Sequence, residues 1–303
     1  MTGRLKIITA MMVFGSVGIF VKYIDLSSSQ IAFLRGLIGS VFLILASISI
    51  RQKLSNKATL KRNMKLLILS GAAIGVNWIF LFQAYKYTTV SNATLSYYFA
   101  PIFVIILAPF VLKEKLTMVK VSCIITAMIG LFLVLNTKDT SVTGSYKHLV
   151  GILYGLSAAI FYAGAILMNK LIKNISGLET TIIQLMVTAL VLYPYVFIKE
   201  PIDFAGIDSN SLILIFILGI LHTGVAYFLY FTSLQELNGQ TIAVFSYIDP
   251  ISAVLMASLF LGESMGSYQV IGGILILGSA FMSERLGDST FTRCKPKNAN
   301  SKA

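Results

Sequence analysis

Long runs of apolar residues, separated by short charged or turn-rich stretches, follow one another along most of the 303-residue chain. Ten of these runs approach the ~20 residues that a membrane-spanning helix needs. The predicted spans are residues 5–21, 31–50, 64–82, 91–112, 118–135, 149–171, 178–198, 211–231, 241–261 and 268–282. Each run is continuously apolar and does not alternate as the strands of a β-barrel do. The pattern therefore predicts an all-α integral membrane protein with ten transmembrane helices.

Composition and charge support this reading and indicate an orientation. The chain is 56% hydrophobic and 12% charged, whereas soluble domains are about 25% charged. With both termini in the cytoplasm, 18 of the 24 Lys and Arg residues lie on the inner side, five lie outside, and Arg35 lies within the second helix. Retention of basic loops in the cytoplasm explains the net charge of +12 without nucleic acid. The basic tail 284–303 is predicted to be a disordered cytoplasmic end.

An internal repeat divides the chain into residues 1–140 and 141–283. A shift of 149 positions aligns, without a gap, Gly75-Val76 with Gly224-Val225, Tyr98 with Tyr247, Pro101-Ile102 with Pro250-Ile251, Glu114 with Glu263 and Val121 with Val270. Because each copy holds five helices, the second copy must cross the membrane in the opposite direction. Loop charge agrees, since Lys113, Lys115 and Lys120 of an inner loop correspond to Gly262, Ser264 and Gln269 of an outer loop.

Two inverted five-helix repeats are typical of secondary transporters, in which similar halves rock about a midplane site. An enzyme is not predicted, because the chain lacks an HExxH sequence, paired Cys ligands and a phosphate-binding glycine loop near a lysine. No cofactor and no metal site are expected. Without a nucleotide-binding motif, active transport would draw on an ion or solute gradient.

Several short motifs carry a resemblance to a known family. They are Phe14-Gly15-Ser16, Phe33-Leu34-Arg35, Ala84-Tyr85-Lys86-Tyr87, Pro101 followed by Lys113-Glu114, and Asp249-Pro250 followed by Gly262-Glu263. With these motifs the chain resembles the EamA-type, ten-helix members of the drug/metabolite transporter superfamily over nearly its whole length. The resemblance implies a plasma-membrane carrier with a central cavity lined mainly by helices 1, 3, 4, 6, 8 and 9, often exporting amino acids or related metabolites. The chain departs from symmetry where Gln184 replaces the repeat mate of Arg35.

Asp249 and His222 are the first candidates for chemistry, because polar side chains at bilayer depth are costly and normally face a cavity or a partner. The repeat places them where the first copy has Ala100 and Ala73. A His-Asp pair at this depth would bind substrate and carry or gate a proton. The alternative is a satisfied structural pair, or an Asp249 that caps backbone freed by Pro250.

Aromatic and small polar residues form a second candidate set for substrate binding. Trp78 pairs with Tyr227 across the repeat, and Tyr98 pairs with Tyr247; such rings stack on aromatic or cationic solutes. Hydrogen bonds are expected from Asn77, Thr94, Gln184 and Thr223. Residues 247 and 249 lie about 200° apart on a helix, so one of them is expected to be a packing residue.

The remaining candidates have both a functional and a structural interpretation. Pro101 and Pro250 kink their helices and act either as hinges or as static bends. Glu114 and Glu263 are expected to cap the amides of the next helix. Arg35 either binds a substrate carboxylate or snorkels to the outer surface.

The sequence thus predicts a cell-membrane exporter of small organic metabolites that works by alternating access, with proton coupling left open. An importer or exporter of cationic amines or drugs is one alternative. A non-transporting assembly or sensor protein that retains the carrier fold is another. The expected partners are the lipid bilayer and a small-molecule substrate, while protons and a homodimer are left open.

Overall fold

The computed structural model describes residues 2–52, 55–113, 117–135, 147–203, 206–237 and 245–292, and every regular element in these ranges is a helix. The first half contains α1 (Gly3–Lys22), α2 (Ser28–Ser49), α3 (Lys57–Tyr87), α4 (Val90–Tyr97), α5 (Ala100–Val111) and α6 (Met118–Leu135). The second half contains α7 (His148–Leu171), α8 (Gly177–Lys199), α9 (Ser209–Ile217), η1 (Leu218–Val225), α10 (Ala226–Glu236), α12 (Ile248–Leu261) and α13 (Ser267–Thr292). The all-α prediction is confirmed for the described ranges.

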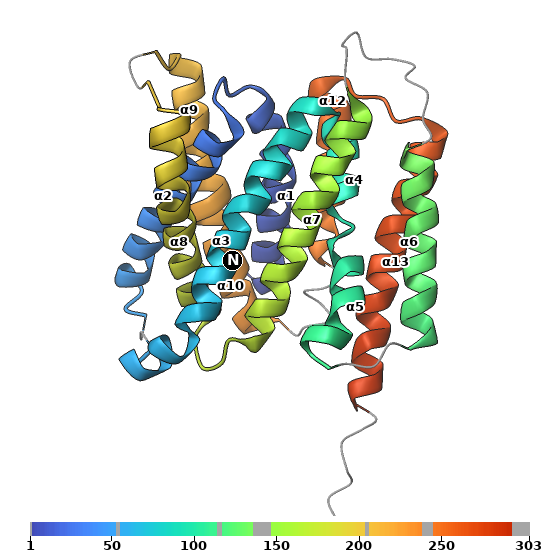
Figure 1. Cartoon of the computed structure of the whole chain (residues 1–303), viewed down its shortest axis with the longest axis horizontal. Helices are drawn as coiled ribbons and strands as arrows, with labels where there is room; N and C mark the ends of the chain where they lie inside the picture. Colours follow the sequence, from blue (N-terminus) through green and yellow to red (C-terminus); the bar gives the residue numbers. More distant parts are fainter. Residues whose placement is uncertain are drawn as a thin grey trace, which may run out of the picture.

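The helices run side by side in one bundle, with α6 and α13 together at one edge and α2, α8 and α9 at the other (Figure 1). Seven helical stretches in the described ranges are long and apolar enough to cross a membrane. Three further apolar helices are shorter, Met118–Val134, Ile248–Leu261 and Ser267–Met282. Large apolar side chains such as Phe110, Leu259 and Leu190 are exposed on the outside, as expected for a surface that faces lipid. Residues 241–244 of the ninth predicted span lie outside the described residues.

The fourth predicted span is interrupted in its middle. α4 ends at Tyr97 and α5 begins at Ala100, so Tyr98 and Phe99 form a break between two short helices. Pro101 lies in the first turn of α5, where its missing N–H removes no helical hydrogen bond. It therefore begins a helix and does not bend a continuous one. α12 begins directly after Tyr247, and Pro250 similarly lies in its first turn. The hinge role of both prolines stays a prediction.

The eighth predicted span contains a feature that the sequence pattern did not predict. Between α9 and α10 the backbone changes to a π-helix, η1, in which Thr223 Oγ1 donates to the carbonyl of Leu218, five residues earlier. Gly219 and Gly224 of η1 approach α2 so closely that an added Cβ would lie 2.6 Å from Ile38 and 2.4 Å from Phe42. π-Helical turns are rare and frequent at functional sites.

Close contacts between helices fix the position of α1. A Cβ added to Gly15 would lie 2.7 Å from the backbone oxygen of Asp249 and 2.9 Å from the backbone nitrogen of Ala253, so only glycine fits against α12. The other side of α1 packs on α10 and η1. As a result α1 adjoins both η1 and α12, the helices that carry His222 and Asp249.

Candidate functional site

Arg35 is a buried cation in the interior of the bundle, with only 4% of its surface exposed. Its Nε–H donates a 2.7 Å hydrogen bond to Thr223 Oγ1 of η1. The guanidinium carbon lies 4.3 Å from the centre of the Trp78 ring, which is a cation–π distance. Arg35 of α2 is therefore held against α3 and η1, and of its two interpretations the one in which it snorkels to the outer surface is wrong.

Asp249 is bound from the opposite half of the chain. The hydroxyl of Tyr98, at the break between α4 and α5, donates a 2.5 Å hydrogen bond to Asp249 Oδ2 in the first turn of α12. The helix break thus brings a phenol against the carboxylate, which an uninterrupted helix would direct differently. Arg35 and Asp249 lie within electrostatic range of each other. Neither takes part in an ion pair recorded in the described residues.

His222 has its own set of partners on η1 and α1. Its Nε2 lies 2.8 Å from Ser16 Oγ, and the imidazole ring contacts Phe20 with 4.6 Å between ring centroids. The side chain is 1% exposed. In the described residues His222 and Asp249 do not bond to each other. Each has its own partner, Ser16 for His222 and Tyr98 for Asp249, and both residues adjoin α1. The sequence did not assign Ser16 a role, although it lies in the Phe14-Gly15-Ser16 motif that carried the family resemblance.

Of the other residues predicted to bind substrate through hydrogen bonds, two instead bond to neighbouring helices. Asn77 donates to the carbonyl of Ala158 on α7 at 2.7 Å, and Gln184 donates to Ser70 and Asn169, so both tie neighbouring helices together. Thr223 instead holds Arg35, as described above. Thr94 is 3% exposed in α4.

The predicted aromatic residues occupy two environments. Trp78 lies under Arg35, and Tyr227 contacts Phe14 of α1 with ring centroids 5.1 Å apart. Tyr247 packs edge-on against Phe281 of α13 at 5.5 Å. Asp249 therefore points towards the polar interior while Tyr247 is packed, in the arrangement that their helical spacing suggested.

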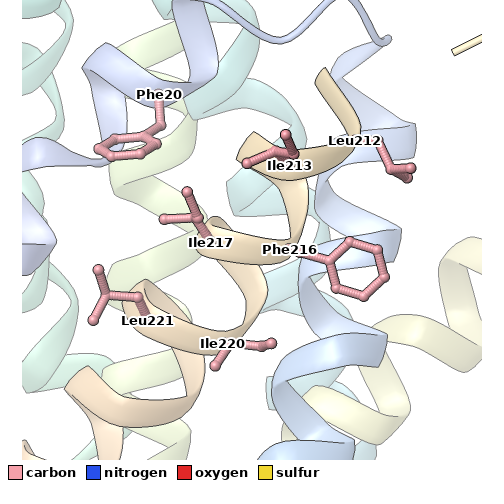
Figure 2. A pocket seen from close by; sticks show the side chains of 7 residues that line it. All are labelled: Phe20, Leu212, Ile213, Phe216, Ile217, Ile220 and Leu221. Atoms are coloured by element: carbon pink, nitrogen blue, oxygen red, sulfur yellow. The ribbon is translucent and has the colours of Figure 1, made fainter. Parts of the chain in front are cut away.

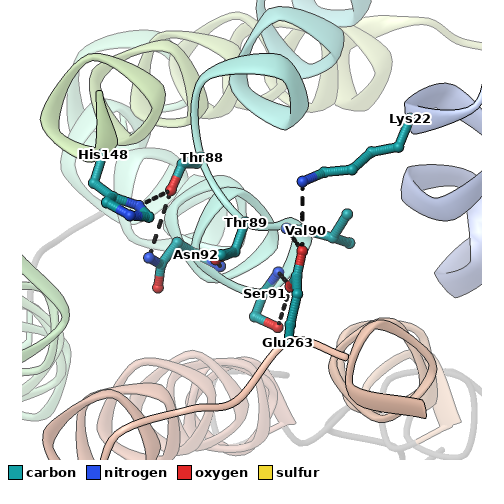
Figure 3. A network of polar contacts seen from close by, with 8 residues as sticks. All are labelled: Lys22, Thr88, Thr89, Val90, Ser91, Asn92, His148 and Glu263. Carbon is teal, nitrogen blue, oxygen red and sulfur yellow. Dashed lines mark hydrogen bonds and ion pairs between the residues drawn. The ribbon is translucent and has the colours of Figure 1, made fainter. Parts of the chain in front are cut away.

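A polar network closes one end of the bundle at the N-terminus of α4 (Figure 3). Glu263, between α12 and α13, accepts from the backbone N–H groups of Val90 and Ser91 at 2.8 and 3.1 Å, and Lys22 lies 3.5 Å from it. Glu263 therefore caps α4 and not the next helix, α13, as its sequence position had suggested. His148 of α7 bonds to the Thr88 hydroxyl at 2.7 Å beside it. Glu114, the repeat mate of Glu263, lies outside the described residues.

An apolar groove of about 620 Å³ runs along the outer face of α9 and η1. Figure 2 shows its lining residues, which are Phe20, Leu212, Ile213, Phe216, Ile217, Ile220 and Leu221. All seven side chains are hydrocarbon, so the groove suits acyl chains. The predicted polar site residues lie elsewhere, in the interior of the bundle.

Comparisons with known proteins identify the family and the fold of the chain. The EamA-like transporter family matches residues 1–136 and 149–284. The "uncharacterized transporter YxxF" of Bacillus subtilis strain 168 is 32% identical over 91% of this chain and 87% of its own length. The "uncharacterized inner membrane transporter YicL" of Salmonella typhimurium strain LT2 is 27% identical over 92% and 94%. A solved crystal structure shares the fold, with a TM-score of 0.63 at 17% identity over 95% of this chain and 98% of that one. The chain belongs to the EamA-like transporter family.

Proposed function

We propose that this protein is a secondary active transporter of the plasma membrane, with ten spans in two inverted repeats and both termini in the cytoplasm. It exports small organic metabolites, such as amino acids or related compounds, by alternating access. The repeats are residues 1–140 and 141–283, followed by the cytoplasmic tail 284–303. The two segments matched by the family support this division.

The packing of the helices supports the inverted repeat. α3 packs against α8, and the equivalent helix of the second copy, η1, packs against α2. Likewise α3 packs on α7 while α10 packs on α1. Lys113 and its repeat mate Gly262 both have positive φ, at 56° and 64°. Tyr247 directly precedes α12 and Tyr98 lies two residues before α5, and both helices have a proline in their first turn. An exchange of the two copies therefore reproduces the same neighbours.

The single observation that carries the transporter proposal is the cluster of buried and half-buried polar residues at interrupted helices. Arg35, Asp249 and His222 are held inside the bundle by Thr223, Tyr98 and Ser16. Ionisable residues at bilayer depth are costly and mark solute and proton pathways. Discontinuous helices of this kind form midplane binding sites in transporters. In the proposed cycle the two halves rock about this cluster, which opens it to one side of the membrane at a time.

Proton exchange is proposed at Asp249, with His222 as a gating residue on the other side of α1. A carboxylate that accepts a hydrogen bond from Tyr98 can take up a proton when the solute leaves and release it when the next solute binds. The rival substrate class, a cationic amine or drug, is less well supported, because the Trp78 ring that would stack on such a cation already lies against Arg35.

Counterflow and proton flux in liposomes test the proposal. Full-length protein is reconstituted with a pH-sensitive dye inside the vesicles, and amino acids, amines and nucleotide sugars are added outside. We expect at least one metabolite to drive proton movement, and Asp249→Asn to transport without that movement. Asp208→Asn is the matched control, because Asp208 is an exposed helix cap. Unchanged proton coupling in Asp249→Asn would exclude Asp249 as the coupling residue, and no flux with any solute would contradict a carrier.

A further inference from the structure

Arg35 has more hydrogen-bonding capacity than its surroundings use. A guanidinium carries five N–H donors in a planar fork, yet the hydrogen bond to Thr223 uses Nε–H alone. In the described part of the chain Arg35 forms no ion pair, and it is 4% exposed. Buried charges in proteins are normally paired and fully hydrogen-bonded. In the described part of the chain the terminal amino groups of this arginine therefore donate to no acceptor.

The groups around Arg35 hold it in one orientation. The Trp78 ring lies 4.3 Å from the guanidinium carbon and Phe82 lies 5.8 Å from it, so aromatic rings support the charged plane. Thr223 fixes the Nε edge. A bidentate ligand can then approach only the edge formed by the terminal amino groups. Preorganisation of this kind lowers the entropy that binding costs.

The equivalent position in the second copy has no such capacity. Gln184, the repeat mate of Arg35, is neutral, and its amide donates to Ser70 at 2.7 Å and to Asn169 at 2.6 Å. The position that is satisfied by neighbouring helices in one half carries, in the other half, a charge that forms no ion pair among the described residues. The structural requirement at this position is thus met without a charge, which leaves the charge of Arg35 to be explained.

We infer that Arg35 binds the carboxylate of the transported solute, with Trp78 and Thr223 as the residues that position the guanidinium. This inference rests on the transporter function proposed above and adds the substrate class. A planar carboxylate matches the guanidinium fork in two parallel hydrogen bonds. One guanidinium balances one negative charge, and the nearby Asp249 opposes a second one. A monocarboxylate therefore fits better than a phosphate monoester.

Trp78 is the only tryptophan of the chain, so its fluorescence reports on this site without any engineering. Purified full-length protein is titrated with L-phenylalanine, 3-phenylpropanoate, L-phenylalaninamide, L-leucine, L-leucinamide and inorganic phosphate, with absorbance corrections for the aromatic probes. The first two separate a zwitterion from a simple carboxylate, and the amides remove the carboxylate alone. Variants are Arg35→Gln, Arg35→Lys and Thr223→Val. Arg62→Gln is the matched control, because Arg62 is exposed on α3.

We expect carboxylates to change the fluorescence of the wild type, and Arg35→Gln to bind them at least about tenfold more weakly, as loss of a charge-assisted bidentate pair requires. Thr223→Val and Arg35→Lys should give intermediate losses, which keeps the test decisive if Arg35→Gln fails to fold. The amides should bind all variants alike. The inference is overturned if no carboxylate perturbs Trp78, if the Arg35 and Thr223 variants bind carboxylates as the wild type does, or if phosphate binds more tightly than every carboxylate.

Failure of this inference can be told apart from failure of the transporter proposal. Carboxylate binding that depends on Arg35, without flux in liposomes, would support the binding site and contradict the carrier. Flux of amines that is indifferent to Arg35→Gln would do the reverse.

Discussion

Replacement of Glu263 gives the sharpest test of what holds the bundle closed at the N-terminus of α4. The carboxylate is 5% exposed and accepts three hydrogen bonds, from the N–H groups of Val90 and Ser91 and from the Ser91 hydroxyl at 3.0 Å. Lys22 adds a positive charge 3.5 Å away. A carboxylate at a helix N-terminus also interacts favourably with the helix dipole.

The cost of losing this group follows from its partners. In Glu263→Ala three buried donors lose their acceptor, and each such donor costs about 1–3 kcal/mol. Partial entry of water reduces the sum, so we expect a loss of about 3–6 kcal/mol, a large share of the 5–15 kcal/mol that stabilises a typical protein. Glu263→Gln keeps one acceptor oxygen and the shape but loses the charge. Its expected loss is about 1–3 kcal/mol, because charge-assisted bonds are roughly twice as strong as neutral ones.

Thermal unfolding in detergent, followed by intrinsic fluorescence, measures these losses. The melting temperature should fall in the order wild type, Glu263→Gln, Glu263→Ala. Lys22→Met, alone and combined with Glu263→Gln, completes a double-mutant cycle that isolates the ion pair. A Glu263→Ala variant that melts together with the wild type would show that the α4 cap contributes nothing, whatever its geometry. Additive effects in the cycle would assign the stability to the backbone hydrogen bonds and not to Lys22.

Two further predictions test other contacts. Gly71→Ala should destabilise the protein by about 1–3 kcal/mol, as overpacking does, because the new Cβ would lie 2.8 Å from Val187 Cβ and 2.9 Å from the carbonyl oxygen of Gln184. The control Gly164→Ala, whose new Cβ would have nothing within 4 Å, should be neutral or stabilising by up to about 1 kcal/mol; equal melting temperatures of the two variants would contradict the close approach of α3 and α8. Burial raises the pKa of the Glu200 carboxyl, but hydrogen bonds from Ser27, Ser29 and Tyr195, together with the charge of Lys86, outweigh this and leave the pKa below its ordinary value. A carboxyl whose pKa is lower in the folded than in the unfolded state stabilises the folded protein at pH values above the unfolded-state pKa. The wild type should therefore lose this stability as the pH falls through and below 4.5. Melting curves of Glu200→Gln should lack that part of the pH dependence, and identical profiles would refute it.

Much of the fold can be predicted from the sequence because a bilayer imposes a simple rule. Every backbone polar group in hydrocarbon must be paired within its own segment, so an apolar run of about 20 residues can only be a helix. Comparison of the two copies also identified Asp249 and His222, because a polar residue that replaces alanine at that depth needs a reason. His222 is buried and Asp249 is half-buried, and both are hydrogen-bonded in the structure.

The hydrogen-bond partners of Asp249 and His222 could not be predicted, because they come from helices far away in sequence. The bonds from Tyr98 to Asp249 and from Ser16 to His222 each span more than a hundred residues. They depend on which faces of the helices meet, and segments that are apolar on all sides give no periodicity from which to read a face. The same reason explains why Glu263 was expected to cap its neighbour in sequence and instead caps α4.

The local breaks in the helices could not be predicted from the sequence for a different reason. A π-helical turn or a two-residue interruption costs backbone hydrogen bonds that only tertiary contacts can offset, such as the approach of Gly219 and Gly224 to α2. Glycines in an apolar run are equally compatible with ordinary close packing. Pro101 did signal an interruption, because a proline cannot donate to the carbonyl four residues earlier and its ring clashes with that carbonyl. For Pro101 this is the carbonyl of Tyr97, the residue at which α4 ends.

Two charged residues inside the bundle, the buried Arg35 and the half-buried Asp249, are each held by a residue of the other half. Arg35 belongs to the first half and is bound by Thr223 of the second, whereas Asp249 belongs to the second half and is bound by Tyr98 of the first. Rocking of one half against the other, as proposed for transport, must strain or break both hydrogen bonds. A carboxylate bound to the free edge of Arg35 lowers the cost of losing Thr223, and a proton on Asp249 lowers the cost of losing Tyr98, because each removes a buried charge that would otherwise be left without a partner. Solute and proton would then each favour motion through their own bond, which links the chemistry of the site to the movement of the halves.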